Sequence, residues 1–256
     1  MAEPPVTCLN ARRGGYGPPR TLTWSIVDRA NRRRGIDYER LYEYRFRNVD
    51  QTAREGVWVE IANHIHQVMG APQKVLDLAA GRGEFINVVP APERWAVDWL
   101  DQGTWQPAVK AIIGNVFDID LPPAYFDGVF ISNFLEHLAS QEQVADLLQL
   151  TRDSLSPGGV VAVLGPNFRY CAKDYFDCAD HVLALTHGAV EEHLAAAGFE
   201  IQTVVPRFLP YSFRSLLPPS PSLTRLYLKA PAAWRLLGKQ FLVVGRVPRP
   251  DGDQRR

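Results

Sequence analysis

Two glycines and two aspartates are the residues whose spacing in this sequence points most directly to chemistry. Gly81 and Gly83 are separated by one residue, and Asp77 lies four positions before the first of them. Glycine has no Cβ, so the backbone at these positions can turn sharply and lie against a ligand. A carboxylate at Asp77 would repel a phosphate and attract a cation. Asp98 ends a short segment, residues 94–98, and can accept hydrogen bonds from the two hydroxyls of a ribose.

The same stretch lacks a feature of dinucleotide-binding sites. Those sites use the pattern G-x-G-x-x-G opening onto a helix, whose positive end holds the pyrophosphate. Ile86 stands where the third glycine would be. The missing glycine argues against a nicotinamide oxidoreductase, and we expect a cationic ligand instead.

The elements that must position these residues follow the pattern of a doubly wound α/β sheet. Residues 75–78 form a short apolar run typical of a buried parallel strand, followed by the glycine turn and a segment that can start a helix. Apolar periodicity predicts helices over 55–69 and 143–154, and over 188–197 with Thr186 as the N-cap. Further strands are predicted over residues 94–98, 126–132, 160–164, 199–205 and 240–247, and residues 111–117 are predicted to form the third strand and its exit.

Four motifs in this order resemble those of the class I S-adenosylmethionine (SAM) methyltransferases. Residues 77–83, D-L-A-A-G-R-G, resemble motif I, D-x-A-x-G-x-G, and Asp98 matches the acid of the second motif. Residues 133–137, N-F-L-E-H, resemble the post-strand motif N-x-L-E-H, and residues 155–159 resemble the L-x-P-G-G turn before the fifth strand. The resemblance covers residues 55–247.

The resemblance implies an α/β fold with a Rossmann-like, doubly wound, seven-stranded sheet whose last strand is antiparallel. It also implies an N-terminal helical cap and a long C-terminal insert. We expect a flexible lead-in over 1–20, a helical cap over 21–69, and a SAM-binding methyltransferase domain over 70–256. Within that domain, residues 165–186 are the expected lid and residues 207–238 the expected insert. The aromatic rings near the start of the cap either close over the cofactor or pack against the sheet.

The resemblance implies SAM as the cofactor. The glycines would pack under its methionine part, Asp77 would order the loop near the amino group, and Asp98 would bind the ribose. At the adenine the family usually has an acid, whereas this chain has Asn115, which can still accept through its carbonyl. Asp118 is the alternative acceptor. The predicted cofactor contacts are Asp77, Ala79, Gly81, Gly83, Asp98, Trp99, Asn115, Val116, Phe117, which could stack on the adenine ring, and Asn133.

Three residues are candidates for handling the acceptor's proton. His137, directly after the fourth predicted strand, titrates near neutrality and can serve as a general base. The alternative is that His137 caps a helix or hydrogen-bonds the backbone. His181 and Tyr170 are the second candidates, in a long polar connection after the fifth strand.

The same connection carries acidic residues that could suggest a metal site. Asp174, Asp177 and Asp180 lie close in sequence to His181. The sequence offers no supporting ligands elsewhere, so we expect no metal.

The predicted function is methyl transfer from SAM to a small-molecule acceptor by direct in-line displacement. The lid and insert resemble those of type 11/12 small-molecule methyltransferases of bacterial glycan and specialised-metabolite biosynthesis. A general base such as His137 favours a hydroxyl group as the methyl acceptor, and hence O-methylation of a natural product or sugar. One alternative is a SAM-binding catalyst that does not methylate, such as a cyclase. Another is a membrane-surface methyltransferase that acts on a lipid-linked glycan.

Composition bounds the partners. The chain has 28 basic and 28 acidic residues, so no general attraction to nucleic acid is expected. It has no apolar stretch of about 20 residues and no apolar signal core, and its three cysteines form no metal pattern. We expect a cytoplasmic protein and leave its oligomeric state open, with a homodimer as one option. Residues 201–250 contain no acid, and the basic insert within them is a substrate cap, a membrane surface or an extension packed on its own domain.

Overall fold

The computed structural model describes residues 35–47, 49–101, 104–211 and 219–250. Its contacts divide the chain into two compact units, Met1–Val49 and Asp50–Arg256. The described part of the first unit contains helix α2 (Tyr38–Phe46), which begins after Asp37, whose carboxylate accepts the backbone N–H of Arg40. The expected lead-in over 1–20 lies outside the described residues. The expected cap over 21–69 spans both units, and its role stays a prediction.

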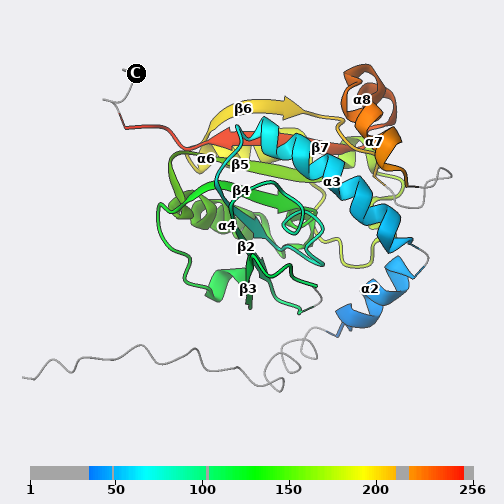
Figure 1. Ribbon diagram of the computed structural model, residues 1–256, viewed down its shortest axis with the longest axis horizontal. Coiled ribbons are helices and arrows are strands. Elements are labelled where there is room, and N and C mark those ends of the chain that lie inside the picture. Colours follow the sequence, from blue (N-terminus) through cyan, green and yellow to red (C-terminus); the bar gives the residue numbers. More distant parts are fainter. Residues whose placement is uncertain (1–34, 48, 102–103, 212–218, 251–256) are drawn as a thin grey trace, which may run out of the picture. The chain divides into compact units, whose positions relative to one another are not determined.

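The second unit is built on a seven-stranded sheet with the order β3-β2-β1-β4-β5-β7-β6, which confirms the predicted fold class (Figure 1). Strands β1 to β5 pair in parallel, and β7 is antiparallel to both β5 and β6. The chain order reverses between β1 and β4, which is where doubly wound sheets bind ligands. The strands are β1 (Lys74–Leu78), β2 (Glu93–Asp98), β3 (Val109–Ile113), β4 (Phe126–Ser132), β5 (Leu155–Pro166), β6 (Glu200–Val205) and β7 (Gln240–Arg246).

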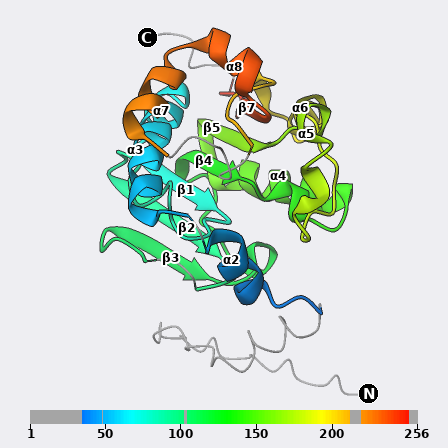
Figure 2. The same cartoon turned by 90° about the vertical axis from the view of Figure 1, so that its right-hand side faces the viewer.

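Helices cover both faces of this sheet (Figure 2). On one face, α3 (Gln51–Val68) packs over a cluster that includes Phe130 of β4. On the other face, α4 (Gln141–Ser154) and α6 (His187–Ala196) pack over a cluster that includes the neighbouring residues Val129 and Ile131. Successive strand residues point to opposite faces, so a strand buried on both sides is apolar throughout. This explains why the central strands could be recognised as short apolar runs.

Side-chain caps fix where these three helices begin. Asp50 accepts the backbone N–H of Ala53 at the start of α3, and Ser140 accepts that of Gln143 at the start of α4. Thr186 caps α6, as predicted, by accepting the backbone N–H of Ala189 at 3.3 Å. Each cap satisfies a backbone donor that the first helical turn leaves without a partner.

The connection between β1 and β2 differs from the expected strand-turn-helix unit. Residues 81–89 form consecutive turns rather than a regular helix. Two hydrogen bonds of helical spacing occur there, from the N–H of Asn87 to the carbonyl of Gly83 and from Val89 to Phe85. Pro90 and Pro92 cannot donate backbone hydrogen bonds, so a helix begun at Gly83 cannot continue past one or two turns.

The exit of the third strand forms a short helix. The strand ends at Ile113, and Asn115 then caps the 3₁₀ helix η1 (Val116–Asp118). The fifth strand begins at Leu155, so the L-x-P-G-G residues belong to it. Leu155 pairs with Phe126 and Val160 with Gly128, which places a bulge between them. Gly158, with φ of 81°, allows this bulge to form.

The connection over 165–186 is a packed structure that contains α5 (Phe168–Cys171) and the 3₁₀ helix η3 (Tyr175–Asp177). Tyr175 is fully buried, and its hydroxyl donates to the carbonyl of Leu183 at 2.6 Å. The hydroxyl also accepts the backbone N–H of Leu185. This tyrosine therefore holds the middle of the expected lid against its C-terminal end.

The described part of the insert packs on helix α3. It contains α7 (Pro221–Leu228) and α8 (Pro231–Leu237). Arg225 of α7 donates to the carboxylate of Glu60 in α3, with Nε 3.0 Å from Oε2. The hydroxyl of Tyr227 donates to the carbonyl of the buried Phe208. These contacts correspond to an extension packed on its own unit.

Within the described residues, no helix combines the length and the apolar character needed to cross a bilayer.

Candidate functional site

Three residues with left-handed backbone conformation shape the loop after β1. The φ angles of Ala79, Gly81 and Gly83 are 60°, 58° and 78°. A Cβ added to Gly83 would lie 2.8 Å from the amide nitrogen of Asn87 and 3.0 Å from the ring of Trp105. A Cβ added to Gly81 would meet nothing closer than a Glu84 carboxylate oxygen at 4.0 Å. Gly83 is therefore packed by the protein, while Gly81 borders open space that a ligand can fill.

Asp98 ties this loop to the end of β2. Its Oδ2 accepts the backbone N–H of Gly81 at 2.7 Å, and its Oδ1 accepts that of Leu100 at 2.9 Å. The N–H of Trp99 also donates to this carboxylate. Each carboxylate oxygen has two lone pairs, so protein donors still leave room for a ligand hydroxyl. Asp98, the residue predicted to bind the ribose, thus also stabilises the glycine turn.

Carboxylates gather around the glycine loop. Asp77 is 2% exposed and accepts the backbone N–H of Ile86. Burial raises the pKa of Asp77 well above its usual value, and the nearby charges of Glu84 and Asp98 raise it further. Burial likewise raises the pKa of Asp98 to about 6, although three backbone N–H donors oppose the shift. A bound cation would favour the ionised form of both groups, so the site suits a positively charged ligand.

Arg54 is a supporting residue that sequence reasoning missed. It lies on α3, and both its Nε and Nη2 are 2.9 Å from Oε1 of Glu84 in the glycine loop. The Arg54 side chain is 8% exposed. The partners lie 30 positions apart, and no local pattern in the sequence indicates the pair. The pair holds the glycine loop against α3.

The predicted adenine contacts lie at the exit of β3. Asn115 is exposed, and its Oδ1 accepts the backbone N–H of Phe117 at 3.3 Å. Its Nδ2 donates to Asp118 at 3.2 Å, so the two alternative acceptors are joined by a hydrogen bond. Val116 is buried, and Phe117 packs against the core cluster under α4. Both acceptors stay candidates.

The post-strand motif begins at Asn133, the last predicted cofactor contact. Asn133 has φ of 49°, and its backbone N–H donates to the carbonyl of Leu164 at 2.8 Å. The chain then forms the 3₁₀ helix η2 (Leu135–His137). The Nδ1 atom of His137 lies 3.0 Å from the backbone oxygen of Asp180 and 3.5 Å from its carboxylate. A carbonyl oxygen can only accept, so Nδ1 carries the hydrogen and Nε2 of the neutral ring holds a lone pair.

The structure brings two of the three predicted proton-handling residues together. The rings of His137 and His181 have centroids 5.0 Å apart at an interplanar angle of 72°. The Tyr175 ring lies 4.7 Å from that of His181, a neighbour that the sequence did not single out. Tyr170 instead contacts Arg207, whose guanidinium carbon lies over the tyrosine ring, 4.9 Å from the ring centroid. Of the nearby acids, Asp180 contacts His137, whereas Asp174 pairs with Lys239 at 2.9 Å.

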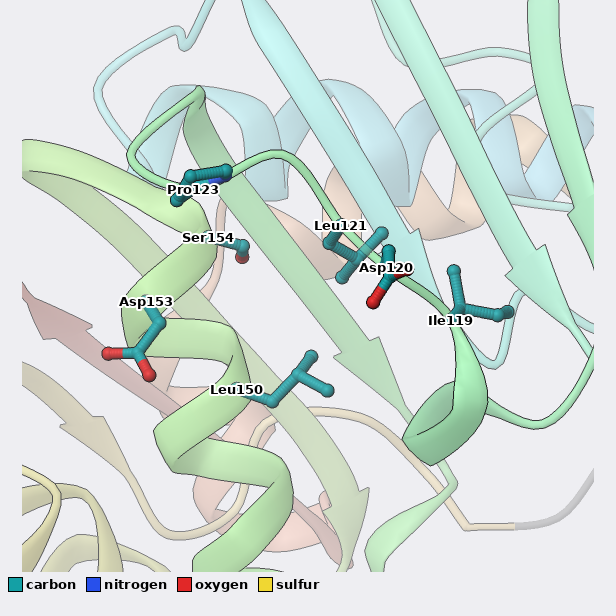
Figure 3. A pocket seen from close by; sticks show the side chains of 7 residues that line it. All are labelled: Ile119, Asp120, Leu121, Pro123, Leu150, Asp153 and Ser154. Atoms are coloured by element: carbon teal, nitrogen blue, oxygen red, sulfur yellow. The ribbon is translucent and has the colours of Figure 1, made fainter. Parts of the chain in front are cut away.

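A separate hollow lies between the segment before β4 and the last turn of α4 (Figure 3). Its volume is about 360 Å³. It contains none of the predicted cofactor or catalytic residues, so the candidate site does not depend on it. Its lining residues are Ile119, Asp120, Leu121, Pro123, Leu150, Asp153 and Ser154.

Comparison with known proteins agrees with this fold. Residues 70–163 match the family model described as a methyltransferase domain. No curated protein sequence matches the chain significantly. Residues 70–163 are therefore similar to a methyltransferase domain.

Solved structures of low sequence identity share the fold. A SAM-dependent methyltransferase from Archaeoglobus fulgidus has a TM-score of 0.59 and 21% identity, covering 82% of this chain and 100% of that one. The N-methyltransferase NodS from Bradyrhizobium japonicum WM9, in complex with S-adenosylhomocysteine, has a TM-score of 0.51 and 12% identity, covering 73% and 84%. The [4+2]-cyclase SpnF has a TM-score of 0.54 and 14% identity, covering 75% and 81%.

Proposed function

We propose that this protein transfers the methyl group of SAM to a hydroxyl oxygen of a small molecule, such as a natural product or a sugar. The observation that carries the proposal is the orientation of His137. Its Nδ1 is occupied by the carbonyl of Asp180, which leaves the Nε2 lone pair available to accept a proton. A hydroxyl must lose its proton on methylation, so a fixed acceptor of this kind suits an oxygen nucleophile.

The reaction that we propose balances as a direct displacement. The sulfonium of SAM supplies an electrophilic methyl carbon. The acceptor oxygen forms the new bond to that carbon, the electrons of the broken carbon–sulfur bond stay on sulfur, and His137 takes the hydroxyl proton. Positioning of two reactants can contribute roughly 7–11 kcal/mol, and a general base about 10²–10⁴-fold in rate.

The cofactor contacts belong to the same proposal. We assign the methionine part of SAM to the open side of Gly81, its ribose to Asp98, and its adenine to Asn115 or Asp118. Three observations support the assignment: the free space at Gly81, the three backbone donors to the Asp98 carboxylate, and the buried carboxyl group of Asp77 beside the loop.

The test is a methyl-transfer assay with purified protein, SAM and a panel of sugars and phenols. We expect S-adenosylhomocysteine to accumulate with at least one hydroxyl acceptor and the rate to fall about 10²-fold or more in His137→Ala. His193→Ala is the matched control, because His193 hydrogen-bonds Gln141 away from the proposed site. Retention of SAM without this product would instead favour a catalyst that does not methylate, such as a cyclase; one structurally similar protein is a [4+2]-cyclase.

A second candidate is a methyltransferase that acts at a membrane surface on a lipid-linked acceptor. The observation that favours it is a set of exposed leucines on α7 and α8, of which Leu226 is 66% and Leu236 78% exposed. Lys229 and Arg235 accompany them, in a region of the sequence without acids. Apolar side chains beside basic ones are typical of helices that lie on anionic lipid.

Sedimentation with lipid vesicles tests this second candidate. We expect binding to vesicles that contain anionic lipid, weaker binding in high salt, and loss of binding in the double variant Leu226→Ser and Leu236→Ser. Val182→Ser is the control, since Val182 is 54% exposed but lies outside the insert. A protein that stays in the supernatant with anionic vesicles at low salt would eliminate the membrane reading.

A further inference from the structure

Three potential metal ligands meet beside the end of β4. One carboxylate oxygen of Glu136 and one ring nitrogen each of His137 and His181 all lie within 4.8 Å of one another. They come from η2 and from the connection after β5, segments more than forty residues apart in the chain. Our sequence-based expectation of no metal rested on the lack of ligands to accompany His181. The fold supplies two candidates.

The orientation of His137 suits metal binding. Its Nδ1–H is held by the backbone oxygen of Asp180, and Nε2, which then has the lone pair, lies 3.9 Å from Oε1 of Glu136. Metal-binding histidines commonly donate their second ring N–H to a carbonyl or a carboxylate in this way. With bonds of about 2.0–2.2 Å, two ligands of one tetrahedral ion lie roughly 3.4 Å apart. A shift of about half an ångström would bring these two atoms to that distance.

Buried charge also favours a cation at this position. Glu136 is 3% exposed and Asp180 is 4% exposed, and both contact His137. Two carboxylates removed from water are costly, and a divalent cation offsets that cost. The carbonyl of Glu136 accepts the backbone N–H groups of Val182 and Leu183, so the two segments are already joined without a metal. The two segments that carry the ligands are therefore joined in advance.

We propose that Glu136, His137 and His181 bind a divalent first-row transition metal, and that this ion holds the oxygen of the methyl acceptor. Two imidazoles and one carboxylate suit zinc, iron, manganese or cobalt better than calcium or magnesium. Three protein ligands leave further positions open for oxygen atoms of a substrate. Asp180 is a positioning residue, because it acts on the ion only through His137.

The second half of this proposal rests on the proposed methyl transfer and replaces one step of it, the transfer of the hydroxyl proton to His137. A hydroxyl bound to the ion loses its proton to solvent more easily, because the cation stabilises the alkoxide. The alkoxide oxygen then bonds to the methyl carbon, and the electrons of the carbon–sulfur bond remain on sulfur. His137 serves in this scheme as a ligand instead of the proton acceptor.

Cobalt titration tests the site directly, because Co²⁺ has visible absorption bands that report nitrogen and oxygen coordination. The full chain, first stripped with a chelator, is expected to bind one equivalent of Co²⁺, and Zn²⁺ should displace it. Glu136→Gln and His181→Ala should each weaken Co²⁺ binding more than tenfold. Asp180→Asn should weaken it less than either of these variants, because the backbone oxygen that holds Nδ1–H of His137 remains. His193→Ala should bind Co²⁺ like the wild type.

Binding of S-adenosylhomocysteine, measured in parallel, separates this proposal from the proposed function. Cluster variants that bind this product normally are folded, so their loss of Co²⁺ would support the metal site. A wild-type protein that binds the product and methylates an acceptor after chelation, yet takes up no Co²⁺, would overturn the metal site and leave methyl transfer standing. Unchanged Co²⁺ binding in Glu136→Gln and His181→Ala would overturn it equally.

Discussion

At the scale of single residues, Gly81 and Gly83 share a left-handed backbone but have different surroundings. Gly83 is enclosed by Asn87 and Trp105, whereas Gly81 faces open space. The sequence alone assigned both glycines the same role, since the motif indicates only that the loop needs two residues without a Cβ. The difference depends on Trp105, which comes from a part of the chain that no motif identifies.

A matched pair of alanine variants separates these two roles. Gly83→Ala should lower the free energy of unfolding by about 3 kcal/mol, through left-handed strain and overpacking. Gly81→Ala should cost only about 1–2 kcal/mol, because strain alone acts there. Its main effect should be a loss of SAM affinity of tenfold or more. Urea unfolding and calorimetry measure both quantities, and equal losses of stability in the two variants would contradict the packing described here.

The raised pKa of Asp98 predicts how SAM affinity depends on pH. The ionised carboxylate accepts hydrogen bonds from the ribose better than the neutral acid, so affinity should rise as pH increases through about 6. Between pH 5 and pH 7 we expect a gain of about tenfold by linkage. For the ligand-free protein the sign is opposite: the raised pKa contributes stability below the unfolded value, and this is lost as pH rises through about 6.

Asp98→Asn is the control for this dependence. It should bind SAM more weakly and with a flatter pH profile, and any remaining slope belongs to Asp77, whose pKa is also raised. Calorimetric titrations at pH 5, 6 and 7 measure the profile. An identical slope in the wild type and in Asp98→Asn would show that Asp98 does not control binding.

At the scale of elements, the ion pair between Arg54 and Glu84 links α3 to the glycine loop. Removal of one partner of a buried pair leaves a charge that the protein must accommodate. We expect Arg54→Met to lower the free energy of unfolding by about 3 kcal/mol and to weaken SAM binding. Arg225→Met removes a pair whose arginine is 64% exposed, and it should cost much less, because solvent screens an exposed ion pair.

Chemical denaturation compares these two methionine variants directly. A cost for Arg54→Met no greater than that for Arg225→Met would show that the buried pair does not stabilise the loop.

The strands were easier to predict than the connections between them. Residues 126–132 were predicted as a strand with the bounds that β4 has, because a doubly covered strand is apolar along its length. The helix expected after Gly83 was wrong, since Pro90 and Pro92 limit the connection to turns. The proline pair was visible in the sequence and was the signal that should have prevented this prediction.

The contact between His137 and His181 could not be predicted from the sequence. His137 and His181 were both named from the sequence, but their ring contact depends on how the connection after β5 folds back. The hydroxyl of Tyr175 fixes that fold by bonding Leu183 and Leu185. Tyr170, which was chosen as a polar aromatic in the same connection, contacts Arg207 instead. Composition could not distinguish these two tyrosines, because the difference lies in tertiary packing.

At the scale of the whole molecule, the described second unit is a sheet with helices on both faces. Carboxyl groups gather at the carboxyl ends of its strands, where the candidate site lies. Its fold class could be predicted because four motifs occur in the order that the sheet requires. The packing of the insert could not be predicted. Its exposed leucines and its contacts with α3 depend on tertiary structure, and this basic segment has no clear sequence pattern.

The central claim is that SAM binds at the carboxyl edge of the sheet, over the glycine turn and against Asp98. Calorimetric titration of wild type and Asp98→Ala with S-adenosylhomocysteine and SAM tests it most directly. We expect one molecule bound per chain of wild type and a loss of affinity of at least tenfold in Asp98→Ala. No measurable binding of either ligand to folded wild-type protein, or equal binding to both proteins, would contradict the claim.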